Sequence, residues 1–164
     1  MIRKLIASLL PCLIALSSMG SIENWLPVER EVGELVASKD VTIVHFWAPW
    51  CGNCSAEKKD GGWTNFIASN PGVKFVFVET WNDGKDSREA LAKYNLGAQA
   101  NLTMLAHPGS RRGDGRMKSF MDLPVTWLPT TWIWRDGAMR FAFNYGEIRF
   151  PILQQLVDDT SDSW

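Results

Sequence analysis

Residues 46–54 read FWAPWCGNC, and no other stretch says as much about this chain. The preceding residues, 41–45, are apolar almost throughout, which is typical of a strand buried on both faces. Cys51 and Cys54 lie where this strand gives way to a helix, and their spacing indicates a redox pair. Because a helix start presents unpaired N–H groups and a partial positive charge, it favours the thiolate of Cys51. Only a thiolate attacks a disulfide, so the pattern predicts thiol–disulfide exchange, with Cys51 as nucleophile and Cys54 as resolving thiol.

Two other uses of the cysteine pair fit the sequence less well. A purely structural disulfide between Cys51 and Cys54 would close a small loop and constrain the unfolded chain little. A zinc site would need further soft ligands, but His45 and His107 fall in a strand and in a distant loop. We therefore expect no metal and no cofactor other than the redox-active disulfide itself.

The first twenty residues have the pattern of a secretory signal peptide. Arg3 and Lys4 form a basic start, residues 5–16 an apolar run, and residues 18–20 a small-residue exit. We expect cleavage before Ser21, which leaves residues 21–164 as the folded domain. An uncleaved anchor is the alternative, although the apolar run is short for a membrane span.

Removal of that segment would make the chain more acidic. The full sequence has 17 Lys+Arg and 18 Asp+Glu, and the signal segment holds two of the basic residues and no acidic one. Nothing in this balance indicates a nucleic-acid partner. Cys12 would also be removed, leaving Cys51 and Cys54 as the only cysteines. In an oxidising compartment such a pair stays disulfide-bonded unless an outside donor reduces it.

The rest of the sequence predicts alternating helices and strands. Helices are expected at residues 28–38, 51–59, 63–69, 86–96 and 152–158, with a break at 60–62. Strands are expected at 41–47, 73–79, 101–106, 129–134 and 139–144, the last two flanking an Asp-Gly turn at 136–137. Residues 107–115 are expected to form a surface loop, and 116–123 a helical turn or two. This order predicts an α/β fold whose mixed central sheet is flanked by helices on both faces.

Together these residues resemble the thioredoxin superfamily. The stretch 46–54 matches its active-site segment, and Pro129 matches the proline that the superfamily holds in cis opposite the disulfide. The nearer resemblance is to the TlpA-like extracytoplasmic members, which include the reductases of cytochrome c maturation. It rests on Glu57 three residues after the second cysteine, on Leu-Pro-Thr-Thr at 128–131, and on the long connection that precedes Pro129. The resemblance implies a thioredoxin-like domain at 21–164, with a segment inserted before the cis-proline hairpin.

The sequence departs from this family at three positions. His45 stands where thioredoxin has an acid, and Asn53 stands where reductases usually have proline. Lys59 replaces the proline that commonly kinks the active-site helix, although the two glycines that follow can supply a bend. These departures bear on the redox potential rather than on the fold.

The resemblance also implies where a substrate would bind. A cis proline at Pro129 would leave the backbone of Leu128 free to pair with an incoming peptide strand. Trp50, next to the nucleophile on a loop, is expected to be partly exposed. With Trp127 it would frame an apolar groove around the sulfur.

Several polar residues have open roles. His45 is either a neutral core histidine or the proton acceptor for Cys54 when the mixed disulfide is resolved. Glu57 is either a helix-surface acid or a buried group that moves protons near Cys54. His107 is expected to be a solvated loop residue. Arg111–Arg112 is expected to be a solvated loop tip, with a docking patch for an acidic partner as the alternative.

The leading functional hypothesis is a protein thiol–disulfide oxidoreductase in the periplasm or another extracytoplasmic compartment, acting as a reductase. Its partners would be protein thiols and disulfides and, as the resemblance implies, a membrane thiol-electron carrier. The missing proline between the cysteines supports a disulfide oxidant or isomerase instead. A non-catalytic copper(I)-binding module that uses the two thiolates is the third hypothesis.

Overall fold

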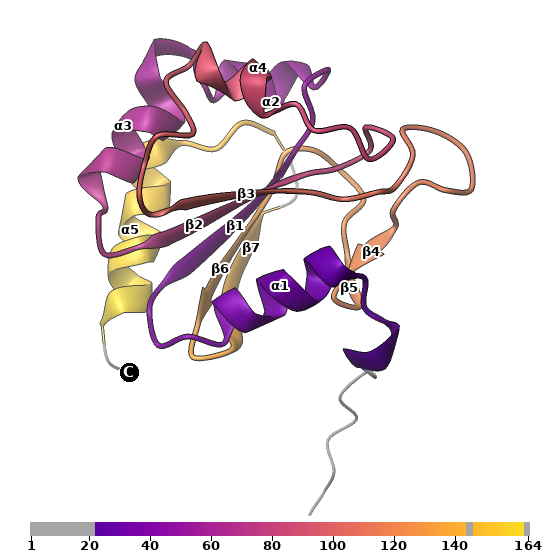
Figure 1. Ribbon diagram of the computed structural model, residues 1–164. Coiled ribbons are helices and arrows are strands. Elements are labelled where there is room, and N and C mark those ends of the chain that lie inside the picture. Colours follow the sequence, from indigo (N-terminus) through magenta and orange to yellow (C-terminus); the bar gives the residue numbers. More distant parts are fainter. Residues whose placement is uncertain (1–21, 144–145, 163–164) are drawn as a thin grey trace, which may run out of the picture.

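The structure is a computed structural model that describes residues 22–143 and 146–162. A five-stranded sheet forms its centre. Its strands, in spatial order, are β3 (Leu102–Ala106), β2 (Lys74–Glu79), β1 (Thr42–Trp47), β6 (Thr130–Arg135) and β7 (Ala138–Phe143). The first three are parallel, whereas β6 is antiparallel to β1 and β7 is antiparallel to β6. The sheet is therefore mixed, as the sequence predicts (Figure 1).

Helices cover the sheet on both sides. They are α1 (Pro27–Val36), α2 (Gly52–Ala56), α3 (Gly62–Ser69), α4 (Arg88–Ala92) and α5 (Phe150–Ser161), with 3₁₀ turns at Ile22–Asn24 and Lys59–Gly61. Figure 1 shows α3 and α5 side by side, and their contact is aromatic. Phe150 of α5 meets Trp63 of α3 edge-on, with 5.3 Å between the ring centroids. This layer lies on the face of the sheet that carries Phe77, which packs on the same Trp63 ring.

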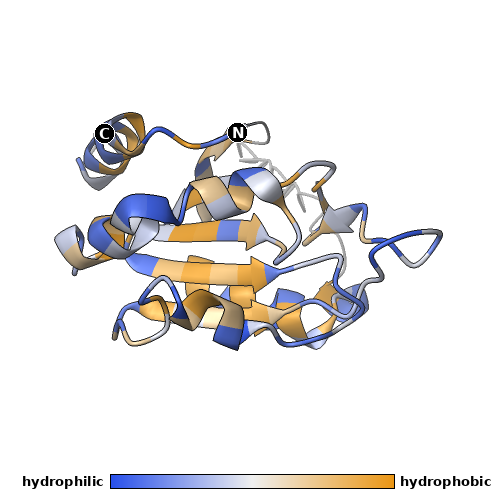
Figure 2. Ribbon diagram, turned by 90° about the horizontal axis from the view of Figure 1, so that it is seen from above, coloured by the Kyte–Doolittle hydropathy of each residue, from blue (hydrophilic) through white to orange (hydrophobic). Residues whose placement is uncertain are grey.

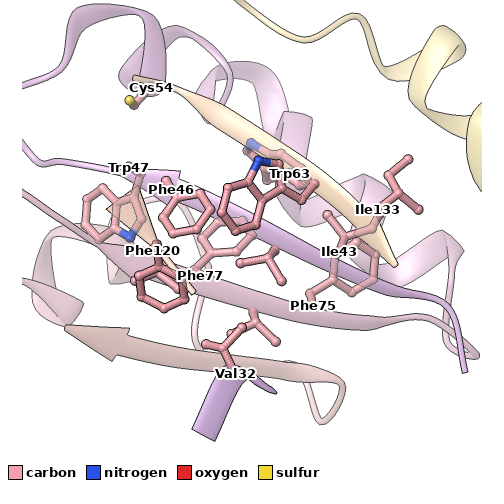
Figure 3. Packing of buried hydrophobic residues seen from close by; sticks show 14 of the residues in the cluster. Val32, Ile43, Phe46, Trp47, Cys54, Trp63, Phe75, Phe77, Phe120 and Ile133 are labelled. Carbon is pink, nitrogen blue, oxygen red and sulfur yellow. The ribbon is translucent and has the colours of Figure 1, made fainter. Parts of the chain in front are cut away.

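Trp63 is the centre of the core on that face. Its side chain is fully buried, and its ring packs edge-on against Phe66, Phe75 and Phe77. Figure 3 shows Trp63, Phe75 and Phe77 among the buried side chains of the core. Aromatic pairs in this geometry add to the hydrophobic gain from burial, so this cluster joins α3 firmly to the sheet.

A two-stranded hairpin contributes to the opposite face. β4 (Ser119–Phe120) pairs with β5 (Leu123–Pro124), and Phe120 packs edge-on against Phe46 of β1. The sequence pattern predicts a helical turn or two at 116–123, and this prediction is wrong. Met121 and the residue after it both have positive φ, which suits a two-residue turn between the strands of a hairpin and not a helix. The Met121 N–H also donates to Glu29 of α1 at 2.8 Å, a long-range contact that leaves no local pattern.

Two turns follow the sequence prediction. The helix that begins at the cysteine pair ends at Ala56, and Asp60 and Gly61 then turn the chain with φ values of 53° and 76°. The break predicted at 60–62 is thus present. Asp136 and Gly137 also have positive φ, 51° and 71°, as a tight hairpin turn requires.

The predicted signal peptide, residues 1–20, lies outside the described residues. Its cleavage before Ser21, and with it the boundary of the domain, stays a prediction. Within the part of the chain that the structure describes, no helix has the length and apolar character needed to cross a bilayer.

We predict that Gly62→Ala destabilises the fold. A Cβ at Gly62 would collide with the backbone carbonyl of Glu57 and approach Phe150 Cε2 to 2.8 Å, so the backbone would have to move. We expect the free energy of unfolding in urea to fall by about 1–3 kcal/mol, the range for overpacking a core. Gly72→Ala is the matched control, because a Cβ there meets nothing within 4 Å and should change stability by less than about 1 kcal/mol. Equal effects of the two substitutions would contradict this account.

Candidate active site

The cysteine pair lies just beyond the end of β1. Cys51 caps the N-terminus of α2, and its backbone N–H donates to Ala48 O at 3.1 Å, closing a turn after the strand. Cys51 and Cys54 are disulfide-bonded, with 5.2 Å between their Cα atoms. The Cys54 N–H donates to Cys51 Sγ at 3.2 Å. This bond would also stabilise a Cys51 thiolate when the pair is reduced.

The two sulfurs differ in access. Cys51 is 7% exposed and Cys54 is 0% exposed. A substrate can therefore reach Cys51 first, while Cys54 can attack only from inside the protein. The order of roles expected from sequence, with Cys51 as nucleophile and Cys54 as resolving thiol, stays a prediction.

The Leu128–Pro129 peptide bond is cis, the geometry expected from the resemblance. The β1–β6 register pairs Phe46 with Thr130, so Pro129 lies at the same edge of the sheet as the cysteine pair. Thr130 Oγ1 donates to Trp127 O at 2.9 Å and holds the turn before the strand.

Two tryptophans are exposed on the loops at this edge. Trp50 is 39% exposed and Trp127 is 50% exposed, in contrast to the nearly buried Trp47, Trp132 and Trp134. Trp50 Nε1–H donates to Trp81 O at 3.0 Å, so its ring is fixed although it faces solvent. Trp50 and Trp127 thus offer apolar surface to a bound chain on the segments that carry Cys51 and Pro129.

A buried polar cluster joins β1 to the residue that follows α2. His45 is 1% exposed and Glu57 is 4% exposed, and His45 Nε2 is 3.4 Å from Glu57 Oε2. His45 Nδ1 lies 2.9 Å from Thr131 Oγ1, whose hydroxyl can donate to it. Trp63 Nε1–H donates to Glu57 Oε2 at 3.1 Å, and the Ile148 N–H donates to Oε1 at 2.7 Å. Glu57 is therefore a buried group, and the surface-acid alternative is wrong.

Burial sets the protonation of both groups. It raises the pKa of Glu57 to about 7, against the donated hydrogen bonds of Ile148 and Trp63, which lower it. Burial also lowers the pKa of His45 well below its usual range, and the nearby positive charge of Lys58 adds to this effect. Near pH 7 the His45 imidazole is therefore neutral, whereas the Glu57 carboxyl group is protonated in part of the molecules and ionised in the rest.

Glu57 borders a cavity of about 240 Å³. Pro129, Thr131, Ile148 and Leu153 are among the other residues that line the cavity. The carboxyl group is therefore buried by protein but adjoins a space that can admit water. Within the described residues, no group of three or more His, Cys, Asp or Glu side chains could hold a metal ion.

Comparison with known proteins agrees with this geometry. No family model matches the chain. The soluble secreted antigen MPT53 of Mycobacterium tuberculosis and of Mycobacterium bovis is 32% identical over 103 residues, which are 62% of this chain and 52% of the antigen. The chain thus spans about half the length of the curated relatives it matches.

Solved structures extend the similarity over most of the chain. A secreted Mycobacterium tuberculosis disulfide oxidoreductase homologous to E. coli DsbE gives a TM-score of 0.57 at 27% identity, covering 75% of this chain and 84% of that one. The chain thus shares the thioredoxin-like fold of this oxidoreductase. StoA from Bacillus subtilis gives a TM-score of 0.51 at 18% identity over 73% of this chain and 83% of its own, which supports the shared fold alone.

One buried residue of this thioredoxin-like site is missed by sequence analysis. Lys58 is 4% exposed, and its Nζ lies 4.7 Å from the Trp47 ring centroid and 5.7 Å from that of Tyr94. Burial lowers the pKa of Lys58 to about 8, and the negative charge of the adjacent Glu57 partly opposes this lowering. The sequence gives little indication that Lys58 is buried. It follows Glu57 directly, but no periodic spacing of apolar residues places it on a buried helix face.

His107 also differs from its prediction. The sequence suggests a solvated loop residue, but the side chain is 6% exposed and its ring lies 6.0 Å from that of Phe120. His107 Nδ1 accepts the Gly109 N–H at 2.9 Å, and burial lowers the pKa of the ring. Phe120 belongs to the β4–β5 hairpin, which the sequence pattern does not predict, and is one of the residues close to the His107 ring.

We predict that Glu57 makes stability fall as pH rises. The folded carboxyl has a pKa of about 7, raised from 4.5, so it keeps a proton that the unfolded chain loses between these values. Its favourable contribution is complete below pH 4.5 and is lost by about pH 7, on the order of 3 kcal/mol. His45 has the opposite sign, because its lowered pKa makes stability fall as pH drops below 6.5.

The comparison of wild type with Glu57→Gln isolates the carboxyl contribution. The glutamine variant should gain roughly 2–3 kcal/mol relative to wild type between pH 5 and pH 8. Urea unfolding of the oxidised proteins at both values measures it. A difference between the two proteins that does not change with pH would exclude a buried titration at Glu57.

Proposed function

We propose that this protein is a thiol–disulfide oxidoreductase that exchanges disulfides with other proteins outside the cytoplasm. One observation carries the proposal. Cys51 is reachable, Cys54 is buried, and the two are bonded at the sheet edge that holds Pro129. An accessible nucleophile with a buried resolving thiol behind it is the arrangement that two-step disulfide exchange requires.

In the reducing direction, the Cys51 thiolate attacks one sulfur of a substrate disulfide and forms a mixed disulfide, releasing the other substrate sulfur as a thiolate. Cys54 then attacks Cys51 Sγ, forms the Cys51–Cys54 disulfide and releases the second substrate sulfur. The substrate gains two electrons, and the protein loses them. The Cys54 thiol must lose its proton before this attack.

Glu57 is the proposed acceptor of that proton. It follows Cys54 by three residues, so the two side chains lie on the same side of the helical turn. A carboxyl group with a pKa of about 7 can take the proton at neutral pH and pass it toward the adjoining cavity. His45, with its lowered pKa, is a poorer base, and we assign it the positioning of Glu57 Oε2.

The external electrons and the compartment belong to the same proposal. A membrane thiol-electron carrier would reduce the Cys51–Cys54 disulfide after each turnover. The predicted signal peptide and the secreted mycobacterial relatives support an extracytoplasmic location. The finer proposal is a reductase, with cytochrome c maturation as the candidate process.

A disulfide oxidant or isomerase is the second candidate. It is favoured by Asn53, which is exposed between the cysteines where reductases usually have proline. The Cys54 N–H that donates to Cys51 Sγ would stabilise the reduced pair and so make the disulfide more oxidising. A copper(I) module remains the third hypothesis, and retention of copper after purification would favour it.

Cysteine substitutions test the two-step scheme with a small peptide disulfide as substrate. We expect Cys54→Ser to accumulate a mixed disulfide with the peptide, and Cys51→Ser to form none, as seen by mass spectrometry without reductant. In the protein with both cysteines, Glu57→Gln should slow the second step about tenfold and leave the first step nearly unchanged. Glu34→Gln, an exposed acid on α1, is the control.

Two outcomes would contradict the scheme. A mixed disulfide in Cys51→Ser would reverse the roles of the cysteines. If His45→Ala slows resolution and Glu57→Gln does not, the imidazole is the proton acceptor.

The reduction potential against a glutathione buffer decides the direction. A reductase should have a potential near that of thioredoxin, about −270 mV, and a strong oxidant one near about −120 mV. We expect a value in the lower half of this range. A potential in the upper half of this range would establish the oxidant candidate.

A further inference from the structure

A cationic loop lies against the exposed tryptophan beside the nucleophile. Residues 107–118 follow β3 and project beyond the sheet, past the loop that follows β2 (Figure 1). The guanidinium carbon of Arg111 lies 4.6 Å from the Trp50 ring centroid, and that of Arg116 lies 3.7 Å from the Trp81 centroid. Because the Trp50 indole donates to Trp81 O, the two stacked pairs form one surface next to Cys51.

Backbone and indole hydrogen bonds fix this loop in place. The Arg111 N–H donates to Asp83 Oδ1 at 3.1 Å, and the Asp83 N–H donates to Gly109 O at 3.2 Å. Trp81 Nε1–H donates to Met117 O at 2.9 Å, and the Met117 side chain is buried. The two arginines are therefore held at the rim of the site at both ends of the loop.

The loop concentrates positive charge in an acidic chain. Residues 107–118 contain four of the 17 Lys+Arg and one of the 18 Asp+Glu of the sequence. Figure 2 shows this loop as a largely hydrophilic segment that projects at the right-hand edge of the view. Among the described residues, no carboxylate forms an ion pair with Arg111, Arg112 or Arg116, and all three are exposed.

Stacking leaves the charge of these arginines available. A guanidinium that lies flat on an aromatic ring keeps its N–H edge free to bind a carboxylate, often with two hydrogen bonds. The ring also restricts the side chain, so less conformational entropy is lost when the carboxylate binds.

We propose that Arg111 and Arg116 form a docking surface for an acidic segment that flanks the reacting cysteine of the substrate protein. The proposal rests on the thiol–disulfide exchange proposed above and specifies its substrate class. A peptide bound along Trp50 would place residues a few positions from its cysteine over the two guanidinium groups. A lipid surface is the poorer occupant, because it would cover Cys51 and would meet a chain whose formal net charge is −1.

Peptide disulfides of matched length test the proposal. Each carries one central cysteine, disulfide-bonded to a small thiol reporter and flanked by aspartate, glutamine or lysine. We expect the reduced wild-type protein to react about tenfold faster with the aspartate peptide than with the lysine peptide at low salt. This preference should fall toward unity at 0.5 M NaCl, because exposed charges are screened.

Substitutions then locate the preference. Arg111→Gln with Arg116→Gln should reduce it to about twofold or less, whereas Arg111→Lys with Arg116→Lys should retain most of it. Arg140→Gln, an exposed arginine on the outer strand β7, is the matched control and should keep the tenfold ratio. The salt dependence of the wild type tests the proposal even if the glutamine variant fails to fold.

The possible outcomes separate this proposal from the proposed function. Reduction of all three peptides at equal rates would overturn the docking surface and leave the exchange activity standing. Reduction of none of them would overturn both. A third outcome would show that the loop binds lipid. In that case the flanking charge of the peptide has no effect on the rate, and the wild-type protein sediments with vesicles of phosphatidylglycerol and phosphatidylcholine whereas the glutamine variant does not. The proposal would then be wrong.

Discussion

The pairing of β1 on both sides is the constraint on which the site depends. All six residues of this strand are buried, and it pairs in parallel with β2 and antiparallel with β6. Because β1 runs toward Cys51 while β6 starts just after Pro129, the register that pairs Phe46 with Thr130 brings the disulfide and the cis proline to one edge. A slip by one residue would also turn His45 to the other face of the sheet. One strand register therefore sets both the position of the disulfide and the face of the sheet on which His45 meets Glu57.

The buried ionisable groups are costly for the fold. The three groups are His45, Glu57 and Lys58, each less than 5% exposed. Burial shifts the pKa of each in the direction that favours its neutral form. Apolar residues of similar volume would be expected to serve stability as well or better. His45 lies on the strand that leads to the cysteine pair, and the other two directly follow the helix that carries it, so the proton transfer proposed at Cys54 offers a reason for their presence. His45 Nε2 lies 3.4 Å from one carboxyl oxygen of Glu57, and the positive charge of Lys58 lowers the pKa of that carboxyl group against the effect of burial.

The fold could be predicted from short-range patterns. The strand before Cys51, the spacing of the cysteines and the Asp-Gly turn at 136–137 each act within a few residues, and each is found as expected. The failures share a cause. The β4–β5 hairpin, the burial of His107 and the aromatic contacts of Lys58 all depend on residues distant in sequence. No local periodicity encodes such contacts, so the sequence pattern predicts a helical turn at 116–123 and a solvated loop around His107 instead.

The same distinction explains how the site surface can vary while the fold stays constant. The segment between β3 and β6 contains a hairpin that covers Phe46 and a loop that covers Trp81. Trp81 is nearly buried beneath Arg116, and its carbonyl holds the indole of Trp50 beside the nucleophile. A substitution in this loop therefore reaches the surface around Cys51 without touching the cysteine motif or the sheet. Because loops tolerate change better than buried strands, this inserted segment is where the structure can alter its substrate preference at least cost to stability.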